Sequence, residues 1–303
     1  MKKSKLWDSL VKDTFANIDE KFLSNFREPG NANNRLAAWD PFDKTMRYFK
    51  FLLFHQIRTK DDTFFSDYAK IGPTHLGNPV TLTVPSGQLI NLDHFFAVEE
   101  CTFLKNNISV NEIEHVLEIG AGFGRTAQAI IKLIDNIKRY TIVDIPEVLS
   151  LSFHYLGKVL TEDEFAKLDF VDAMTLSKMN YDFSTVDLSI NIDSFQEMPQ
   201  ETVRDYFERI IKNSKFFYSK NAVGKYSPES VGLYDIDQNQ LLDVFSLGLS
   251  TEVIDIFNEA ELVRARQKHV EQYCPIGFTP ITQEPLGIFP YYLNVLYQKN
   301  NDQ

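Results

Sequence analysis

Three closely spaced glycines are the clearest indication of a ligand-binding loop in this sequence. Gly120, Gly122 and Gly124 follow a short apolar run, residues 116–119, and precede a segment whose apolar residues recur at helical spacing. Glycines in that position allow a tight turn and let a ligand approach the backbone closely. A nicotinamide-binding GxGxxG loop would need its third glycine where Arg125 stands. The loop also lacks the Lys-Ser/Thr pair of a phosphate-binding P-loop.

Carboxylates are predicted at the ends of strands near this loop. Glu118 lies two residues before Gly120, where it suits a cationic or amine-bearing ligand. Asp144 ends the second predicted strand and could accept two hydrogen bonds from a ribose diol, while Asp172 ends the third and could meet the amine of an adenine. Such a set predicts a nucleoside ligand without a diphosphate, and S-adenosyl-L-methionine fits it. The alternative is a loop that only turns the chain from strand to helix. The predicted cofactor site is completed by neighbouring strand-end residues: Ile145, Ala173 and Asn191.

Strands and helices alternate after residue 109 in a pattern typical of an α/β fold. Amphipathic helices separate the successive strands, which predicts a mostly parallel sheet. Two late segments, residues 269–273 and 292–299, have no helix between them and are predicted to close the edge of a seven-stranded sheet, the last strand antiparallel. The other predicted strands cover residues 116–119, 140–145, 168–173, 186–193 and 215–220.

Residues 1–108 are expected to form a helical, aromatic-rich cap, and residues 109–303 the sheet domain. Leu6 and Leu10 indicate a helix at the start, and Asp93 is placed to cap a helix over residues 94–105. Pro146 suits the first turn of the helix after the second strand. Most of its aromatic side chains are expected to pack helices on the sheet, while some, with residues 77–79, could form a lid that excludes water from the acceptor.

Composition excludes several classes of protein. The 303 residues are 44% hydrophobic, enough for a sizeable core, and the formal net charge is −11. That charge disfavours binding along a nucleic-acid backbone or on an anionic membrane. Cys101 and Cys274 are the two cysteines, too few for a disulfide scaffold. No apolar stretch is nearly as long as the roughly 18 residues that a membrane-spanning helix needs. Asp8 and Asp13 interrupt the signal-peptide-like start, so we expect a cytoplasmic protein.

Residues 116–133 (VLEIGAGFGRTAQAIIKL) and 140–160 (YTIVDIPEVLSLSFHYLGKVL) resemble class I methyltransferases and, more narrowly, a bacterial family of sugar O-methyltransferases. Further matches are LGNP at residues 76–79 and NIDSFQEMP at 191–199, so the resemblance spans roughly residues 75–220. The glycine loop is generic to methyltransferases, whereas VDIPEVL and DSFQEM are more specific. The resemblance implies a Rossmann-like fold and methyl transfer from S-adenosylmethionine to a sugar hydroxyl of a surface polysaccharide or a glycosylated natural product.

An alcohol is a poor nucleophile at neutral pH, so this reaction would need a base within hydrogen-bond reach of the hydroxyl. Ligands bind at the carboxyl ends of parallel strands, which places Asp193 and Glu197, after the fourth strand, beside the methionine part of the cofactor. They are the leading candidates, although Glu197 could alternatively stabilise a helix N-terminus. His94, near a helix start, and His269, opening a late predicted strand, are the rivals, with a structural role as the default.

The acceptor is predicted to be a small molecule or a sugar-linked compound, and neither nucleic acid nor a membrane span is expected. No histidine has a zinc-site spacing, so no metal site is predicted, and a weak magnesium site at Asp193 is left open, as is homo-oligomer formation. Two alternatives remain: methyl transfer to a phenol or amine, and a non-catalytic cofactor-binding partner of a glycan pathway. The predicted acceptor-binding residues are Asn78, Lys220, Asn221 and Tyr226.

Overall fold

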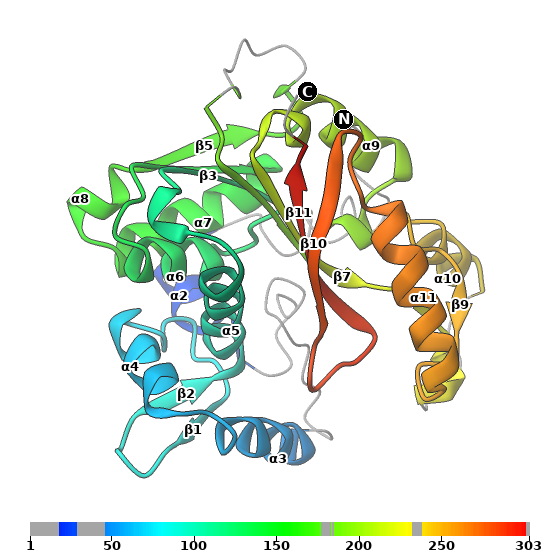
Figure 1. Ribbon diagram of the computed structural model, residues 1–303. Helices are drawn as coiled ribbons and strands as arrows, with labels where there is room; N and C mark the ends of the chain where they lie inside the picture. The colour runs from blue at the N-terminus through cyan, green and yellow to red at the C-terminus, as the bar shows by residue number, and fades with distance from the viewer. Residues whose placement is uncertain (1–17, 29–45, 177–182, 184, 232–237, 301–303) are drawn as a thin grey trace. The chain divides into compact units, whose positions relative to one another are not determined.

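The computed structural model describes residues 18–28, 46–176, 183, 185–231 and 238–300 (Figure 1). The helix predicted from Leu6 and Leu10 lies outside these residues. The chain divides into two compact units. Among described residues, the N-terminal unit contains 18–28, 46–114 and 121–172, and the C-terminal unit contains 115–120 and the residues from 173 onward. The predicted division into a cap of residues 1–108 and a domain of residues 109–303 stays a prediction.

A seven-stranded, mostly parallel sheet is the main element of the fold, as predicted. Its strand order is β10-β11-β7-β6-β3-β4-β5. β3 pairs with β6, β6 with β7 and β4 with β5 in parallel, whereas β11 is antiparallel to both β7 and β10. The strands are β3 (His115–Ile119), β4 (Arg139–Asp144), β5 (Leu168–Asp172), β6 (Leu188–Ile192), β7 (Phe216–Ala222), β10 (Phe278–Pro285) and β11 (Tyr292–Lys299).

β3 and β6 are buried along their whole length, and both hold polar side chains in that buried setting, Glu118 in β3 and Ser189 and Asn191 in β6. β10 has the opposite character, because only Phe278 of its eight residues is fully buried. Its Thr, Gln and Glu side chains gave no apolar signal, so this edge strand was missed by the sequence prediction.

The N-terminal unit is mostly helical, with one small hairpin that was not predicted. Asn91 caps α5, because its Oδ1 accepts a hydrogen bond from His94 N at 3.0 Å. The predicted cap residue, Asp93, lies in the first turn instead, where it pairs with Arg27. Pro146 opens α7 as predicted. Besides β4 and β5 the elements are α2 (Glu20–Asn25), α3 (Met46–Ile57), α4 (Asp62–Lys70), β1 (Thr81–Thr83), β2 (Leu89–Asn91), α5 (Leu92–Asn107), η2 (Val110–Glu112), α6 (Arg125–Leu133), α7 (Pro146–Val159) and α8 (Glu162–Phe165).

The C-terminal unit adds short helices and one long helix to its strands. The strand predicted at residues 269–273 was wrong, because this segment ends helix α11 (Glu259–Gln272). Asn258 caps that helix, and Leu262, Ala265 and His269 are buried at helical spacing. The other elements are η4 (Phe195–Glu197), α9 (Gln200–Arg209), η5 (Ile211–Asn213), β8 (Lys225–Tyr226), η6 (Pro228–Val231), α10 (Gln238–Phe245) and β9 (Val253–Ile254).

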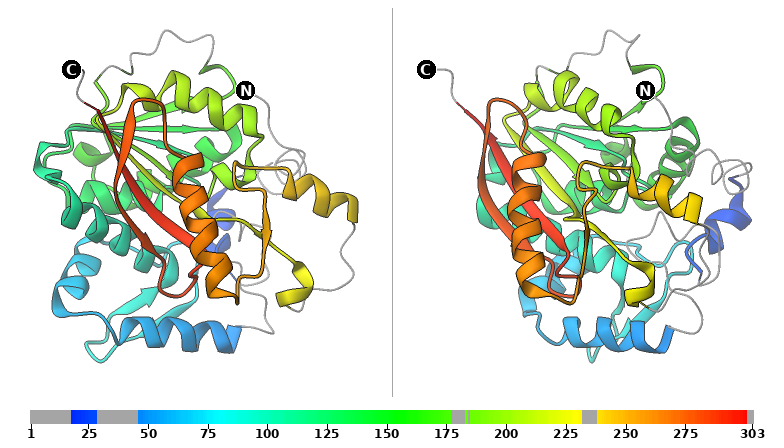
Figure 2. Two further views of the ribbon diagram at one scale, coloured as in Figure 1. Left: turned by 45° about the vertical axis from the view of Figure 1, so that its right-hand side comes forward. Right: turned by 90° about the vertical axis from the view of Figure 1, so that its right-hand side faces the viewer.

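Helix α11 runs alongside the β10–β11 hairpin, as both views of Figure 2 show. The hydroxyl of Tyr297, on β11, donates a hydrogen bond to the carbonyl oxygen of Val270 at 3.0 Å and joins the two elements. No helix in the described parts of the chain is long and apolar enough to span a membrane.

Gly124→Ala should destabilise the protein more than Gly72→Ala. Both glycines have left-handed backbones, with φ of 95° and 90°. A Cβ at Gly72 meets no atom within 4 Å, whereas a Cβ at Gly124 would lie 2.8 Å from Leu156 Cδ1. We expect Gly72→Ala to lower the free energy of unfolding by about 1 kcal/mol from backbone strain, and Gly124→Ala by roughly 1–3 kcal/mol more from overpacking. Denaturant titration of both variants measures this, and equal losses would contradict it.

Candidate functional site

The glycine loop passes from one unit to the other after Gly120, and each half is described within its own unit. Gly120 has φ of 74°, and a Cβ there would lie 2.1 Å from Ser194 Oγ, which itself donates to Ile119 O at 3.1 Å. Gly122 and Gly124 also have left-handed backbones, with φ of 60° and 95°. Backbone conformation therefore requires these glycines, and at Gly120 the packing excludes any side chain.

Asp144 ends β4 with its carboxylate directed at the glycine loop. Its Oδ2 accepts a hydrogen bond from Gly122 N at 3.2 Å, and its Oδ1 accepts one from Ile145 N at 2.8 Å. Burial nevertheless raises the pKa of Asp144 to about 7, against the lowering effect of these backbone hydrogen bonds. A negative charge held against the loop disfavours a bound diphosphate and favours a ligand that donates hydrogen bonds.

Asp144 and Asp172 are register partners at the carboxyl ends of the parallel pair β4 and β5. Both are half-buried, so the two predicted carboxylates lie side by side. Ala173, which follows β5, is buried. Glu118, on β3 in the C-terminal unit, is 2% exposed and is the register partner of Ile190 on β6. Each predicted acidic residue therefore occupies the strand position that the sequence assigned to it.

A chain of side-chain amides organises the ends of β6 and β7. Asn191 Nδ2 donates to Ile119 O at 2.9 Å and to Ser194 Oγ at 2.6 Å. Asn221 Nδ2 donates to Asn191 Oδ1 at 2.9 Å and to Ser219 Oγ at 3.0 Å. Both asparagines are fully buried, and Asn221 Oδ1 has no hydrogen-bond partner among the described residues. The amides hold Ser194 against Gly120 and so set the turn that follows β6.

That turn carries both predicted base candidates. Asp193 has φ of 61°, a strained conformation that aspartate tolerates better than most residues, and its N–H donates to Lys220 O at 2.9 Å. Glu197 ends η4, and its N–H donates to Ser194 O at 3.1 Å. Both carboxylates are half-buried, whereas Lys220 is 2% exposed.

Gln196 links this turn to β7, to β11 and to Lys225, a residue that the sequence prediction left out. Its Oε1 accepts from Ala222 N at 2.8 Å, and its Nε2 donates to the hydroxyl of Tyr292 at 3.0 Å. Its backbone carbonyl accepts from Lys225 Nζ at 3.1 Å. The ring of the predicted residue Tyr226 lies 5.6 Å from that of Tyr291, which precedes Tyr292. The adjacent tyrosines 291 and 292, at the start of a predicted strand, were the available sequence signal.

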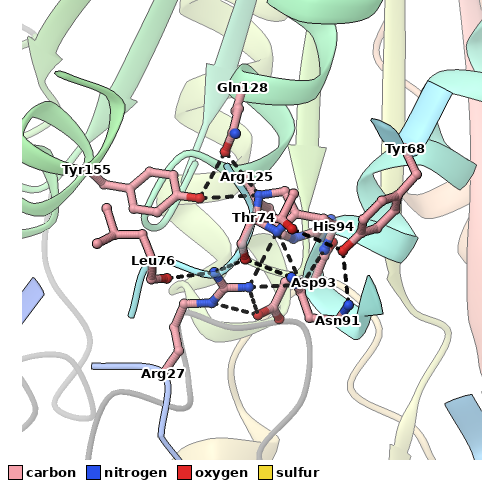
Figure 3. A network of polar contacts seen from close by, with 10 residues as sticks. All are labelled: Arg27, Tyr68, Thr74, Leu76, Asn91, Asp93, His94, Arg125, Gln128 and Tyr155. Atoms are coloured by element: carbon pink, nitrogen blue, oxygen red, sulfur yellow. Dashed lines mark hydrogen bonds and ion pairs between the residues drawn. The ribbon is translucent and has the colours of Figure 1, made fainter. Parts of the chain in front are cut away.

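A buried network centred on Arg27, after α2, organises the N-terminal unit (Figure 3). Arg27 is 4% exposed, and its Nε and Nη2 donate to Asp93 Oδ2 at 3.0 and 2.7 Å. Nη2 also donates to Asn91 Oδ1 at 2.9 Å, and Nη1 donates to the carbonyls of Thr74 and Leu76 at 3.1 and 2.9 Å. All five guanidinium N–H groups therefore have acceptors. No sequence motif pointed to Arg27.

The same arginine packs on the glycine loop. Its Cζ lies 4.9 Å from the ring centroid of Phe123, the residue between Gly122 and Gly124. Phe123 also makes edge contacts with Phe26 at 5.5 Å and Tyr155 at 4.8 Å. The loop side chain is thus fixed between α2 and α7.

His94 belongs to this network and is fully buried. Its Nε2 lies 3.0 Å from Gln128 Oε1, which also accepts from the hydroxyl of Tyr155 at 2.8 Å. Burial, together with the nearby charge of Arg27, lowers the pKa of His94 to about 3. A neutral, enclosed imidazole with polar partners acts here as a structural group. Asn78, with φ of 55°, donates to Glu28 Oε1 at 2.6 Å in the same unit.

His269 is also enclosed, in the C-terminal unit. It is fully buried on α11, stacks on Tyr273 at 4.3 Å and lies 2.9 Å from Ser250 Oγ through Nδ1. Its Nε2 has no hydrogen-bond partner among the described residues, and burial lowers its pKa to about 3. Within the described ranges there is also no group of three or more His, Cys, Asp or Glu residues that could hold a metal ion.

No model of a known protein family matches this chain, and no curated protein matches it. Among solved structures, the mitomycin 7-O-methyltransferase MmcR is 15% identical over 68% of this chain and 56% of its own, with a TM-score of 0.41. The methyltransferase domain of bacterial CtHen1-C is 14% identical over 70% of this chain and 100% of its own, with a TM-score of 0.49. Human N-acetylserotonin methyltransferase is 15% identical over 69% of this chain and 54% of its own, with a TM-score of 0.40. At these values the similarities do not establish a function.

Asp144→Asn should stabilise the protein increasingly as pH rises. The folded state raises the pKa of Asp144 to about 7, so the folded protein binds the carboxyl proton more tightly than the unfolded chain does. Ionised Asp144 therefore lowers the free energy of unfolding, and this destabilisation grows between about pH 4 and pH 7. We expect the stability advantage of the variant to grow by roughly 3 kcal/mol between pH 4.5 and pH 8, because each pKa unit corresponds to about 1.4 kcal/mol. Thermal unfolding at both pH values measures this, with the exposed residue Asp163 changed to Asn as control. A pH-independent difference would contradict it.

Arg27→Met should destabilise the protein strongly, because it leaves the Asp93 carboxylate buried without its cation. We expect a loss of about 3–5 kcal/mol, as for other buried pairs that lose one partner. Arg27→Met combined with Asp93→Asn should recover part of that loss. Lys138→Met is the matched control, since the Lys138–Glu114 pair is 67% and 48% exposed and should contribute about 0–1 kcal/mol. Similar losses in both single variants, measured by denaturant titration, would count against the central role of Arg27.

Proposed function

We propose that this chain is a class I methyltransferase that transfers a methyl group from S-adenosylmethionine to a sugar hydroxyl. The observation that carries the proposal is the Asp144 carboxylate, held by a backbone N–H of the glycine loop. An acceptor in that place suits a ribose diol, and two donated hydrogen bonds would favour its ionised form. The same charge would repel the diphosphate of a dinucleotide.

The residues present fit this cofactor. Asp144 would accept from the ribose hydroxyls, Asp172 beside it from the adenine amine, and Glu118 would face the amino-acid part. Asn191 has both of its side-chain atoms engaged by neighbouring groups, so we assign it to the support of the turn at Ser194. When bound, S-adenosylmethionine supplies a methyl group on a positively charged sulfonium, which is already activated toward an oxygen nucleophile.

The chain itself must hold the acceptor, exclude water and remove the hydroxyl proton. Asp193 and Glu197 are half-buried on the turn after β6 and can accept hydrogen bonds from sugar hydroxyls. His94 and His269 are both fully buried, and we assign them structural roles. The choice of a sugar as acceptor rests on the sequence resemblance over residues 75–220.

Calorimetric titration with S-adenosylhomocysteine should show micromolar binding, and titration with NAD should show none. Asp144→Ala should weaken binding about 10- to 100-fold, because a charge-assisted hydrogen bond is worth about 1.5–3 kcal/mol. Asp163→Ala, which removes an exposed carboxylate of the same unit, should bind like wild type. If neither ligand binds, the cofactor assignment falls. Unchanged affinity in Asp144→Ala would remove the ribose role of that residue alone.

The acceptor is tested by incubating the protein with radiolabelled S-adenosylmethionine and sets of sugar nucleotides, glycans, phenols and amines. Label on sugar acceptors supports the proposal, and label on phenols or amines alone would replace the acceptor class. Glu197→Gln and Asp193→Asn should keep S-adenosylhomocysteine affinity within about threefold of wild type while turnover falls, because both residues lie on the acceptor side of the proposed site.

A further inference from the structure

Lys225, on the short strand β8, is a lysine in an unusual setting. It is half-buried, and its Nζ makes one hydrogen bond to the described residues, to Gln196 O at 3.1 Å. An ammonium group carries three donors, so this lysine keeps hydrogen-bonding capacity inside a partly closed environment. Burial lowers the pKa of Lys225 to about 8, while the nearby carboxylate of Glu197 acts in the opposite direction.

Gln196 connects Lys225 to a group of three tyrosines, Tyr226, Tyr291 and Tyr292. Gln196, which holds Lys225 through its carbonyl, donates through its side chain to Tyr292 at 3.0 Å. The ring of Tyr291 lies 5.1 Å from that of Tyr292 and 5.6 Å from that of Tyr226, and all three rings are half-buried. Such rings present flat faces on which the C–H surface of a sugar, or another ring, can lie.

The pKa of Lys225 depends on the charged groups around it. Glu197 acts directly on Lys225, and Asp193 acts on the neighbouring tyrosines. The backbone carbonyl of Glu252, the residue before β9, accepts from Lys225 N, and its carboxylate pairs with Lys268 at 2.7 Å.

Burial raises the pKa values of Tyr226, Tyr291 and Tyr292 above that of an ordinary tyrosine, so these phenols stay neutral at pH 7–9. Within this cluster of described groups, Lys225 is the one with a pKa near 8.

We propose that Lys225 is the base that takes the proton from the acceptor hydroxyl, with Glu197 beside it and with Tyr226 and Tyr291 forming the wall against which the acceptor ring lies. This inference rests on the proposed function. The hydroxyl oxygen forms the new C–O bond to the methyl carbon, the C–S bond breaks with its electron pair left on sulfur, and the hydroxyl proton passes to the neutral Nζ. One positive charge disappears at sulfur and one appears on Lys225, so the step balances.

Lys225 suits this role better than the two carboxylates that the sequence indicated. A base is most effective when its pKa lies near the working pH, and an ordinary carboxylate titrates near about 4. Glu197 then has a different role, because its negative charge stabilises the ammonium that forms on Lys225. The rate is therefore expected to rise with pH through the titration of Lys225.

The pKa of Lys225 can be measured without the cofactor, by competitive acetylation of the whole protein across pH 6–11 followed by peptide mass spectrometry. We expect the reactivity of Lys225 to have its midpoint near pH 8, and the exposed lysine Lys212 serves as internal reference. Glu197→Gln should move the midpoint of Lys225 to lower pH, because the carboxylate favours its charged form. A midpoint at pH 10 or above would overturn the inference whatever the enzyme assay gives.

The second measurement separates a base from a binding cation. Lys225→Met should lower kcat about 100-fold, the lower end of the contribution of general-base catalysis, with S-adenosylhomocysteine affinity within about twofold of wild type. Lys225→Arg should not restore turnover, because a guanidinium does not release its proton in this pH range. Lys212→Met is the control and should behave as wild type. Rescue by arginine, or normal turnover of Lys225→Met, would overturn the inference.

These outcomes distinguish the inference from the function on which it rests. If wild type binds no S-adenosylhomocysteine and methylates nothing, the proposed function fails, and the role of Lys225 as its base fails with it even if the acetylation midpoint is near pH 8. If wild type binds the ligand and turns over while the Lys225 variants are unaffected, the inference alone fails. Circular dichroism of each variant checks that loss of turnover is not loss of fold.

Discussion

A buried positive charge organises the N-terminal unit. Removing a guanidinium from water is costly, and the cost is offset only when every N–H finds an acceptor and a carboxylate balances the charge. Arg27 meets both conditions through Asp93, Asn91 and two backbone carbonyls. Those requirements determine where the loop before β1 runs and where α5 begins. They also place Phe123, and with it the middle of the glycine loop, against the face of Arg27.

In the C-terminal unit, hydrogen bonds between buried side-chain amides organise the structure, as the Arg27–Asp93 ion pair does in the N-terminal unit. Asn191 and Asn221 satisfy one another and hold Ser194 beneath Gly120, where no side chain fits. The turn that results carries Asp193 in a left-handed conformation. A short chain of buried polar groups therefore decides how the residues after β6 are presented, and small changes within it would move the whole turn.

Several groups at the strand ends are in states that cost stability. Asp144 has a raised pKa, Lys225 a lowered one, and Asp193 a strained backbone. Such features tend to collect where a protein binds or transforms a ligand, because the same desolvation that destabilises a charge prepares it to react. In the N-terminal unit the feature lies at the carboxyl end of β4, and in the C-terminal unit the features lie in the segments that follow β6 and β7. The enclosed histidines, His94 and His269, differ because their surroundings leave no access for a ligand.

The sequence by itself determined the parallel strands, the glycine loop and the positions of Asp144 and Asp172, because apolar runs and glycines report local backbone requirements directly. It also located Asp193 and Glu197 on the turn after β6. It failed at α11, where a helix was taken for a strand, and at β10, where an exposed edge strand has no apolar pattern. Only the tertiary structure could show that Arg27 reaches Phe123 and that Lys225 lies beside Glu197. Those contacts join residues distant in the chain, and burial of a charge depends on what the fold packs around it.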